Sequence, residues 1–395
     1  MIPVLRERFN REFSLLRYRN FVRQVSRRAG VEIEFRLSET PCFFPSALLD
    51  QLVDVAGQLV GQLLRNQEYR RAADEIVPPE FRVARSEPIP TFMQVDFGLV
   101  ATDTGFEGRL VELQAFPSLY GFQLALAEVS RELYGLDALG MCFDKLTRDE
   151  YVARVGAAIL NGHDPAQVVL MEIDPARQKT RPDFEVTEQL WGVRAIDIRA
   201  VTKRGKRLFY RRDGVETPIA RIYNRVIPDE LQRAVSSRPF DYRDDLEVEW
   251  AGGPDWFFRI SKFSIPWLKH SWVPLTHYLS NLGAVPPNRD EWVLKPLFSF
   301  AGGGIVFAPT DRDLAAIPHG KRSNYILQRR VAFTPVIAAP PGPTQAEIRI
   351  MFIREGDALR AVMPLVRMGR GRMMGVDHNK GLEWVGASAA LIDQS

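Results

Sequence analysis

The spacing of the hydrophobic positions divides the chain into a helical, a mixed and a strand-rich part. Over residues 1–75 apolar side chains recur every three or four positions, which predicts amphipathic helices. Proline-rich pieces at 77–79 and 87–90 interrupt this pattern and predict a linker. Two apolar runs follow at 93–101 and 109–113, and the polar turn between them predicts a β-hairpin. The clearest helical series comprises Leu48, Leu49, Leu52, Val53, Val55, Leu59 and Leu63.

The middle of the chain alternates between strand and helix patterns. Residues 168–173 form an apolar run without alternation, which is typical of a strand buried on both faces. A helical pattern over 183–192 and a strand-like run at 194–198 come next, and runs at 207–211 and 219–225 predict further strands. This order predicts a small open α/β domain.

The last third is rich in strands and punctuated by glycine and proline, with strands predicted at 292–295, 325–328 and 346–353. The whole pattern indicates a mixed α/β (α+β) protein. We predict three parts: residues 1–150 with the helical segment and the first hairpin, residues 151–240 with the small open α/β domain, and residues 241–395 with the remaining strands.

Composition narrows the class of protein. The 395 residues are 46% hydrophobic and 26% charged, which excludes disordered and collagen-like chains. The net charge of +3 is too balanced to indicate a nucleic-acid binder. No apolar run approaches the roughly 18 residues of a membrane helix, and the N-terminus is too charged for a signal peptide. Two cysteines suit a reducing compartment. We therefore expect a cytoplasmic protein that binds neither nucleic acid nor a membrane.

The sharpest chemical signal is a lysine followed by a glycine-rich tip. Lys295 ends a predicted strand, and Ser299 leads into Gly302, Gly303 and Gly304. Glycine lets backbone N–H groups approach phosphate oxygens, and an ammonium group neutralises their charge. The pattern predicts a phosphate-binding loop, and the alternative is a glycine-rich hairpin beside an incidental surface lysine. It is not a Walker A loop, because no Gly-Lys-Ser/Thr follows.

Oxygen donors form a second signal upstream. Asp96 and Glu112 lie on the two strands of the predicted hairpin, so pairing would place them side by side. Gln114 follows Glu112 by two positions and points to the same face of its strand. Two carboxylates and an amide oxygen are the kind of ligand set that Mg²⁺ prefers. The alternative is a solvated acidic sheet face. The histidines and cysteines show no zinc-ligand spacing.

Taken in order, these pieces resemble glutathionylspermidine synthetase, in the circularly permuted branch of the ATP-grasp superfamily. The resemblance runs from about residue 90 to 335, and its carriers are Asp96, residues 112–119, Ser261-Lys262 and residues 293–304. It implies an ATP-grasp fold with a small pre-ATP-grasp domain. It also implies roles for single residues: Mg²⁺ on Asp96, Glu112 and Gln114, ATP phosphates at Lys262, Lys295, Ser299 and Gly302 to Gly304, and adenine near Gln328.

The chain departs from the family pattern at three points. Gln94 stands where the family has an Arg, Gln114 replaces an Asn ligand, and Ser261 replaces an Asn before the first lysine. The amidase domain of the bifunctional members has no counterpart. Nucleotide binding remains the expectation, while the substrates are left open.

A second possible ligand set lies near the C-terminus. Conventional ATP-grasp enzymes take their metal ligands from strands after the lysine. Glu347 and the run Asp377-His378-Asn379 stand in such positions. The sequence leaves both placements of the metal open.

Arginines are the candidates for binding an anionic substrate. Arg367, Arg370 and Arg372 form a cluster whose guanidinium groups suit phosphate or carboxylate, with a solvated basic loop as the alternative. Arg225 follows a strand of the small domain, and ligands of open α/β sheets collect beyond the strand ends. We expect Arg225 and Arg370 to contact substrate.

These observations predict an ATP- and Mg-dependent carboxylate–amine ligase that works through an acyl-phosphate. Lys262, Lys295 and Arg367 are its expected catalytic residues. The acid and the amine, small molecules or peptides, remain unidentified. The alternatives are a nucleotide-binding protein without catalysis and a kinase on the same scaffold.

Overall fold

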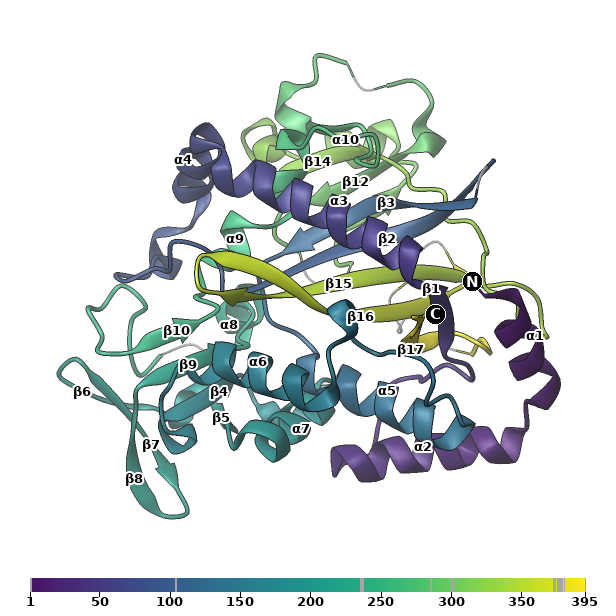
Figure 1. Ribbon diagram of the computed structural model, residues 1–395. Coiled ribbons are helices and arrows are strands. Elements are labelled where there is room, and N and C mark those ends of the chain that lie inside the picture. The colour runs from purple at the N-terminus through teal and green to yellow at the C-terminus, as the bar shows by residue number, and fades with distance from the viewer. Residues whose placement is uncertain are drawn as a thin grey trace.

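The computed structural model describes residues 2–103, 105–234, 238–284, 286–299, 302–371, 374, 379 and 381–394. Its largest sheet combines strands from both ends of the chain (Figure 1). The strand order is β1 (Cys42–Pro45), β17 (Gly386–Asp393), β16 (Ala358–Gly369), β15 (Gln345–Glu355), β2 (Phe92–Thr102) and β3 (Gly105–Gln114). Only β1 runs parallel to its neighbour among these pairs.

The hairpin predicted from the sequence is confirmed as β2 and β3. Asp96 pairs with Glu112, and a β-bulge shifts the register just after this pair, so that Phe97 pairs with Leu110. On its other side β2 pairs with β15, which places the hairpin next to a strand from the far end of the chain.

The two faces of the large sheet are covered differently. Helix α3 (Ser46–Arg65) covers one face, where alternate residues such as Val95 and Ile350 are fully buried. All members of its predicted apolar series are buried except the partly buried Val53. On the other face, α5 (Tyr120–Tyr134) and α6 (Arg148–Leu160) pack on the apolar half, against residues such as Phe92 and Met351. The remaining half of that face is polar.

A small parallel sheet contains strands from the region of the predicted open α/β domain, together with one strand from beyond residue 240. Four parallel strands lie in the order β10 (Glu249–Ala251), β9 (Arg221–Asn224), β4 (Val168–Glu172) and β5 (Arg194–Asp197), and α7 (Arg181–Trp191) connects β4 to β5. The run at 219–225 is split, because Ile219 ends one strand and Arg221 starts β9. The earlier strand belongs to a separate antiparallel sheet that projects from the body in Figure 1, made of β6 (Thr202–Arg204), β7 (Arg207–Arg212) and β8 (Val215–Ile219).

A third four-stranded sheet carries the lysine and the glycine-rich tip. It is antiparallel, in the order β11 (Thr276–Tyr278), β14 (Tyr325–Arg329), β12 (Trp292–Pro296) and β13 (Val306–Phe307). Leu294 and Leu327 pack in its own small core with Leu314 of α10 (Asp311–Ala315). The strands predicted at 292–295 and 325–328 are thereby confirmed.

The remaining helices frame these sheets. They are α1 (Pro3–Glu12), α2 (Leu15–Ala29), α4 (Gln67–Ile76), α8 (Pro228–Ala234) and α9 (Trp256–Arg259). The helical pattern expected over residues 1–75 is thus observed, with β1 and an irregular segment between α2 and α3. In the part of the chain that the structure describes, no helix has the length and apolar character needed to cross a bilayer.

Candidate functional site

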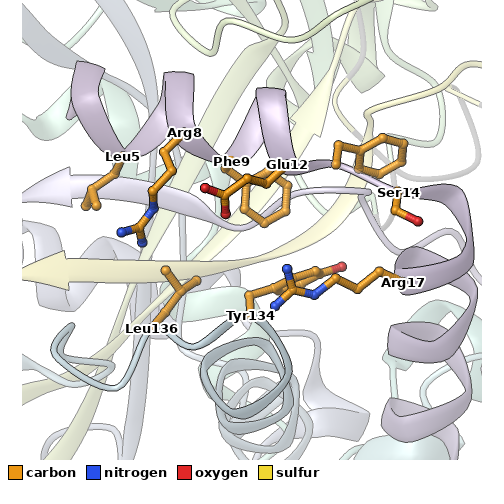
Figure 2. Close-up of a pocket in the computed structure, with 9 residues that line it drawn as sticks. Leu5, Arg8, Phe9, Glu12, Ser14, Arg17, Tyr134 and Leu136 are labelled. Carbon is orange, nitrogen blue, oxygen red and sulfur yellow. The ribbon is translucent and has the colours of Figure 1, made fainter.

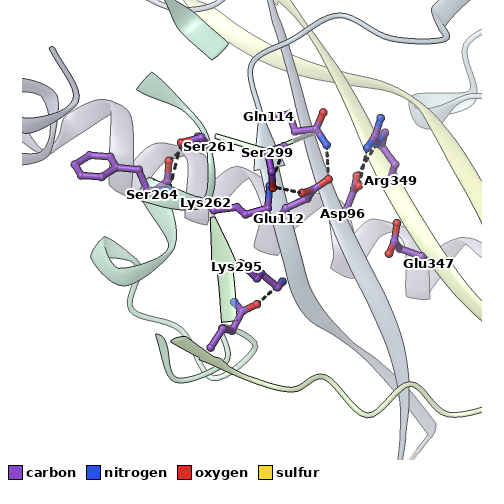
Figure 3. Close-up of polar contacts among 12 residues, drawn as sticks. Asp96, Glu112, Gln114, Ser261, Lys262, Ser264, Lys295, Ser299, Glu347 and Arg349 are labelled. Carbon is purple, nitrogen blue, oxygen red and sulfur yellow. Dashed lines mark hydrogen bonds and ion pairs between the residues drawn. The ribbon is translucent and has the colours of Figure 1, made fainter. Parts of the chain in front are cut away.

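Charged side chains from three neighbouring strands meet on the polar half of the large sheet. Arg349 of β15 pairs with Asp96 of β2, and Asp96 pairs with Glu112 of β3. Residues directly opposite one another in antiparallel strands project from the same face. Figure 3 shows these side chains in a row with Gln114 and Glu347. The expectation that Asp96 and Glu112 lie side by side is confirmed.

Asp96 is held by two guanidinium groups. Arg349 donates through Nε to Oδ1 at 2.6 Å and through Nη2 to Oδ2 at 2.7 Å. Arg367 of β16 donates to Oδ2 at 2.6 Å. Gln94 completes the arrangement, because it accepts from Arg349 Nη1 at 2.7 Å and donates to the Ser118 carbonyl at 2.9 Å. With Asp96 only 1% exposed, both of its oxygens are engaged away from water.

Glu112 and Glu347 flank this pair. The Gln114 amide donates to Glu112, and Lys262 Nζ lies 3.7 Å from Glu112 Oε2. Burial by itself raises the pKa of Glu112, but the Lys262 ammonium and the neighbouring guanidinium groups outweigh it and hold that pKa below its usual range. Burial raises the pKa of Glu347, and its ion pair with Arg367 offsets this only in part. Of these two glutamates, Glu112 is therefore the one held more firmly in its charged form.

The two lysines approach from the antiparallel sheet and the segment before it. Lys295 Nζ donates to Gln328 Oε1 at 2.6 Å, and Gln328 Nε2 donates to Thr276 Oγ1 at 3.2 Å. Burial lowers the pKa of Lys295 to about 8, against the opposing effect of the Glu112 carboxylate. Lys262 Nζ donates to the Ser299 carbonyl at 2.9 Å (Figure 3). Lys262 begins a 3₁₀-helix whose N-cap is Ser261, which explains the fixed position of this lysine.

The glycine-rich tip folds back towards Lys295. Gly302 and Gly304 have φ values of 79° and 71°, which disfavour any residue with a Cβ. A Cβ on Gly304 would lie 2.8 Å from Cγ of Pro296, the residue after Lys295. The hydroxyl of Ser299 is buried without a hydrogen-bond partner in the described residues. Gly303 is exposed between these glycines, so the tip has backbone free for a ligand.

The site fits phosphate better than it fits the full predicted metal set. Four cations, Lys262, Lys295, Arg349 and Arg367, surround three carboxylates, and the Ser299 hydroxyl and Arg367 Nε are buried donors without a described acceptor. Nowhere in the described residues do three or more His, Cys, Asp and Glu side chains form a group that could hold a metal ion. Both Asp96 oxygens accept from guanidinium groups, and the two Glu112 oxygens face the Gln114 amide and the Lys262 ammonium. Binding of Mg²⁺ by Asp96, Glu112 and Gln114 stays a prediction.

The other predicted residues lie apart from this group. Arg225 is 2% exposed, lies 5.0 Å from the Phe116 ring and donates to the Pro117 carbonyl. It thus fastens the loop after β3, which Asp183 also holds by accepting backbone N–H groups at its end. Contact of Arg225 with substrate stays a prediction.

Near the C-terminus the structure describes only some of the residues predicted to bind substrate or metal. Arg370 Nη2 donates to the Gly342 carbonyl at 2.8 Å, and its backbone N–H donates to the Asn379 side chain. Asp377, His378 and Arg372 lie outside the described residues. Glu347, the first member of this alternative metal set, lies on the same sheet face as Asp96, so this carboxylate is a neighbour of the upstream set.

Sequence reasoning gave Arg349 and Gln94 no role in the site. A signal for Arg349 is present, because Glu347 and Arg349 are charged residues two positions apart in the otherwise apolar run 346–353. In a strand, two such residues share one face and require a polar partner on it.

Comparison with known proteins identifies the fold. No family model matches the chain, and no curated protein matches it. Among solved structures it is similar to a glutathione synthetase-like effector (GSS30) from Globodera pallida in its apo form. The TM-score is 0.57 at 12% identity, over 95% of this chain and 96% of that chain. The mixed α/β architecture is therefore a glutathione synthetase-like, ATP-grasp-like fold, as the resemblance implied. The comparison does not single out glutathionylspermidine synthetase.

Proposed function

We propose that this protein is an ATP-dependent ligase that joins a carboxylate to an amine through an acyl-phosphate. The observation that carries the proposal is that Lys262 and Lys295 lie close to the charged side chains on the polar half of the large sheet. Such a cluster of cations with unsatisfied buried donors suits a polyphosphate chain. The ATP-grasp-like fold agrees with this assignment but leaves activity and substrate open.

ATP would lie between the antiparallel sheet and the large sheet. Lys295 and Lys262 would exchange their present contacts with Gln328 and Ser299 for phosphate oxygens. The Ser299 hydroxyl and the backbone of Gly302, Gly303 and Gly304 would then supply neutral donors. Gln328, released by Lys295, would remain bonded to Thr276 and lie near the adenine.

Mg²⁺ would be held by Glu112 and Gln114, in keeping with the low pKa of Glu112. When bound, it would neutralise charge on the phosphates during transfer. Asp96 belongs to the arginines in this arrangement. Arg367 is the group with a donor to spare, since its Nε is buried without a described partner, and it would bind the acid substrate or the transferred phosphoryl group.

The chemistry requires no protein nucleophile. A carboxylate oxygen of the acid attacks the γ-phosphorus of ATP, and the bond from that phosphorus to the ADP oxygen breaks. The amine nitrogen then attacks the acyl carbon and loses a proton as inorganic phosphate leaves. Both steps depend on positioning and charge neutralisation, which the lysines and arginines provide.

The buried cysteines Cys42 and Cys142 form no disulfide, which accords with a cytoplasmic setting.

One observation favours a second candidate, a nucleotide-binding protein without turnover. Asp96 has no unengaged oxygen, and Gln114 donates to Glu112, so the metal ligands are fewer than an active ligase normally uses. Such a protein would bind ATP without converting it to ADP, and its function would depend on whether ATP is bound.

The experiment is to incubate the protein with ATP and Mg²⁺ and a panel of peptide and amino-acid carboxylates, with and without amines, and to follow ADP. ADP formation that requires both an acid and an amine supports the ligase. ADP with a stably phosphorylated acceptor indicates a kinase, and ATP binding without ADP supports the second candidate. Lys295→Gln serves as the inactive control, and the absence of ATP binding to the wild type overturns both proposals.

A further inference from the structure

The charge of the chain is distributed unevenly, although its total is nearly balanced. Residues 1–30 contain eight Arg, no Lys, two Glu and no Asp. The rest of the chain has 44 Lys and Arg against 47 Asp and Glu. Helix α2 is the most basic element of this segment, because it carries five Arg and no acidic residue. The whole-chain balance conceals this region, and the expectation of no membrane partner considered only membrane-spanning helices.

The outer side of α2 combines arginines with exposed leucines. At 3.6 residues per turn, Leu15, Leu16, Arg19, Arg23 and Arg27 fall within an arc of about 120°. We call these five residues the arginine face. The opposite side, which includes Phe21 and Val25, is buried. Leu15 and Leu16 are 53% and 74% exposed, although leucines of an amphipathic helix normally belong to its buried side.

No described carboxylate neutralises the arginine face. The acidic residues of the neighbouring α5 are already paired: Arg28 contacts Glu128 at 2.7 Å and Glu132 at 2.8 Å, and Arg148 also contacts Glu128. The exposed Glu32 and Glu34 follow the C-terminal end of α2, roughly 20 Å along the helix from the leucines.

Arg17, which lies outside the arginine face, contacts the protein itself. Arg17 turns towards α5, where it donates to the Leu133 carbonyl at 2.7 Å and lies over the Tyr134 ring (Figure 2). The cleft beside it has only about 20 Å³ of space, room for one water, so Leu15 and Leu16 have no pocket to enter there. An open groove of about 440 Å³ lies between α2 and α5, and Arg27 lines it.

We propose that the arginine face docks on an anionic lipid bilayer. The guanidinium groups would contact lipid phosphates and carboxylates, while Leu15 and Leu16 enter the boundary with the acyl chains. A bilayer interface offers negative charge and hydrocarbon within a few ångströms, which matches this mixture of side chains. A nucleic acid offers the negative charge but no apolar medium for the leucines. This proposal does not depend on the ligase assignment.

The test is flotation of the full chain with vesicles of phosphatidylcholine alone and vesicles that also contain phosphatidylserine. We expect binding only to the phosphatidylserine vesicles, and release as salt is raised. R19Q/R23Q/R27Q should weaken binding roughly 100-fold, at about fivefold per arginine. The control R65Q/R70Q/R71Q removes the same charge from exposed positions on α3 and α4 and should bind like the wild type.

L15A/L16A separates a bilayer from other polyanions. It should lose on the order of tenfold per leucine on the vesicles, and keep its binding to a single-stranded RNA probe. Unchanged melting temperatures confirm that the variants fold. The proposal is overturned by equal binding to both vesicle types, by no vesicle binding at low salt, by an unaffected R19Q/R23Q/R27Q, or by vesicle binding that L15A/L16A leaves intact.

Discussion

Asp96→Asn tests the assignment of this carboxylate to the arginines instead of a metal. The substitution keeps the size of the side chain but removes its charge and replaces one acceptor oxygen with an amide NH₂. That group would face the N–H groups of Arg349 and Arg367, which now donate to Asp96 at 2.6–2.7 Å. Arg349 would keep Gln94 and the one uncharged oxygen left at position 96, and Arg367 would keep Glu347.

The expected cost follows from the burial of these groups. Removing one partner of a buried ion pair typically costs about 3–5 kcal/mol, because the remaining charge is left uncompensated. Arg349 is 6% exposed and takes the full effect, whereas Arg367 is 27% exposed and retains a carboxylate. We therefore expect a loss near the lower end, about 3 kcal/mol of unfolding free energy.

The assay is thermal melting of wild type and Asp96→Asn, each with and without Mg·ATP. We expect a melting temperature several degrees lower for the ligand-free variant, and a rise with Mg·ATP that is reduced but present. Asp54→Asn, at an exposed position on α3, is the control for the lost charge and should melt like the wild type.

A metal ligand would give the opposite pattern. Without metal, the Asp96 and Glu112 carboxylates of a metal site repel one another, so Asn at position 96 would leave the ligand-free melting temperature unchanged or higher. It would also abolish the rise with Mg·ATP. That pair of results would refute the assignment of Asp96 to the arginines.

Three further predictions concern other parts of the site. Lys295→Gln should weaken ATP binding roughly tenfold or more in calorimetry, because a charged hydrogen bond to phosphate is lost. Since burial lowers the pKa of Lys295 to about 8, wild-type ATP affinity should fall as pH rises through this value, and the affinity of Lys295→Gln should not. The folding stability should change in the opposite direction. Between pH 8 and 10.5 the buried Lys295 loses its proton while the unfolded chain keeps it, so the free energy of unfolding should rise with pH. Gly304→Ala should lower ATP affinity several-fold and the melting temperature only slightly, because a left-handed φ of 71° costs a residue with a Cβ about 1–2 kcal/mol in an exposed tip. Equal affinity would show that the tip does not cover the nucleotide. Arg225→Met should lower the melting temperature, because it leaves the buried carboxylates of Glu172 and Asp183 without their cation. A variant that melts like the wild type but binds substrate more weakly would instead support the substrate role of Arg225.

Local pattern was sufficient for the parts of the site whose partners are close in sequence. Asp96 and Glu112 belong to one hairpin, so the alternation of the two runs and the turn between them determine which residues lie opposite. Lys295 and the glycine tip are adjacent in the chain, and their position at a strand end followed from the same reasoning. The apolar series of α3 likewise predicted its buried side.

Burial at the strand ends could not be predicted in this way. Arg225 follows β9, as a substrate-binding residue of an open sheet would, but the position of a residue at an edge does not say whether that edge is already filled. The loop after β3 fills it, and Arg225 is 2% exposed beneath that loop. That contact spans 108 positions of the sequence, and no local spacing contains it.

The same reason explains why the metal could not be placed from the sequence. The two ligand sets were alternatives because the two branches of the ATP-grasp superfamily take metal ligands from different parts of the chain, and Asp96 and Glu347 are 251 positions apart in the sequence. The order β16-β15-β2-β3 makes them neighbours and places Arg349 of β15 opposite Asp96, on the side away from Glu112. Our proposal that Asp96 serves the two guanidinium groups rests on this arrangement, because a buried cation left without a fixed anion is strongly destabilising. The pairing of distant strands therefore determines which charges meet at the site.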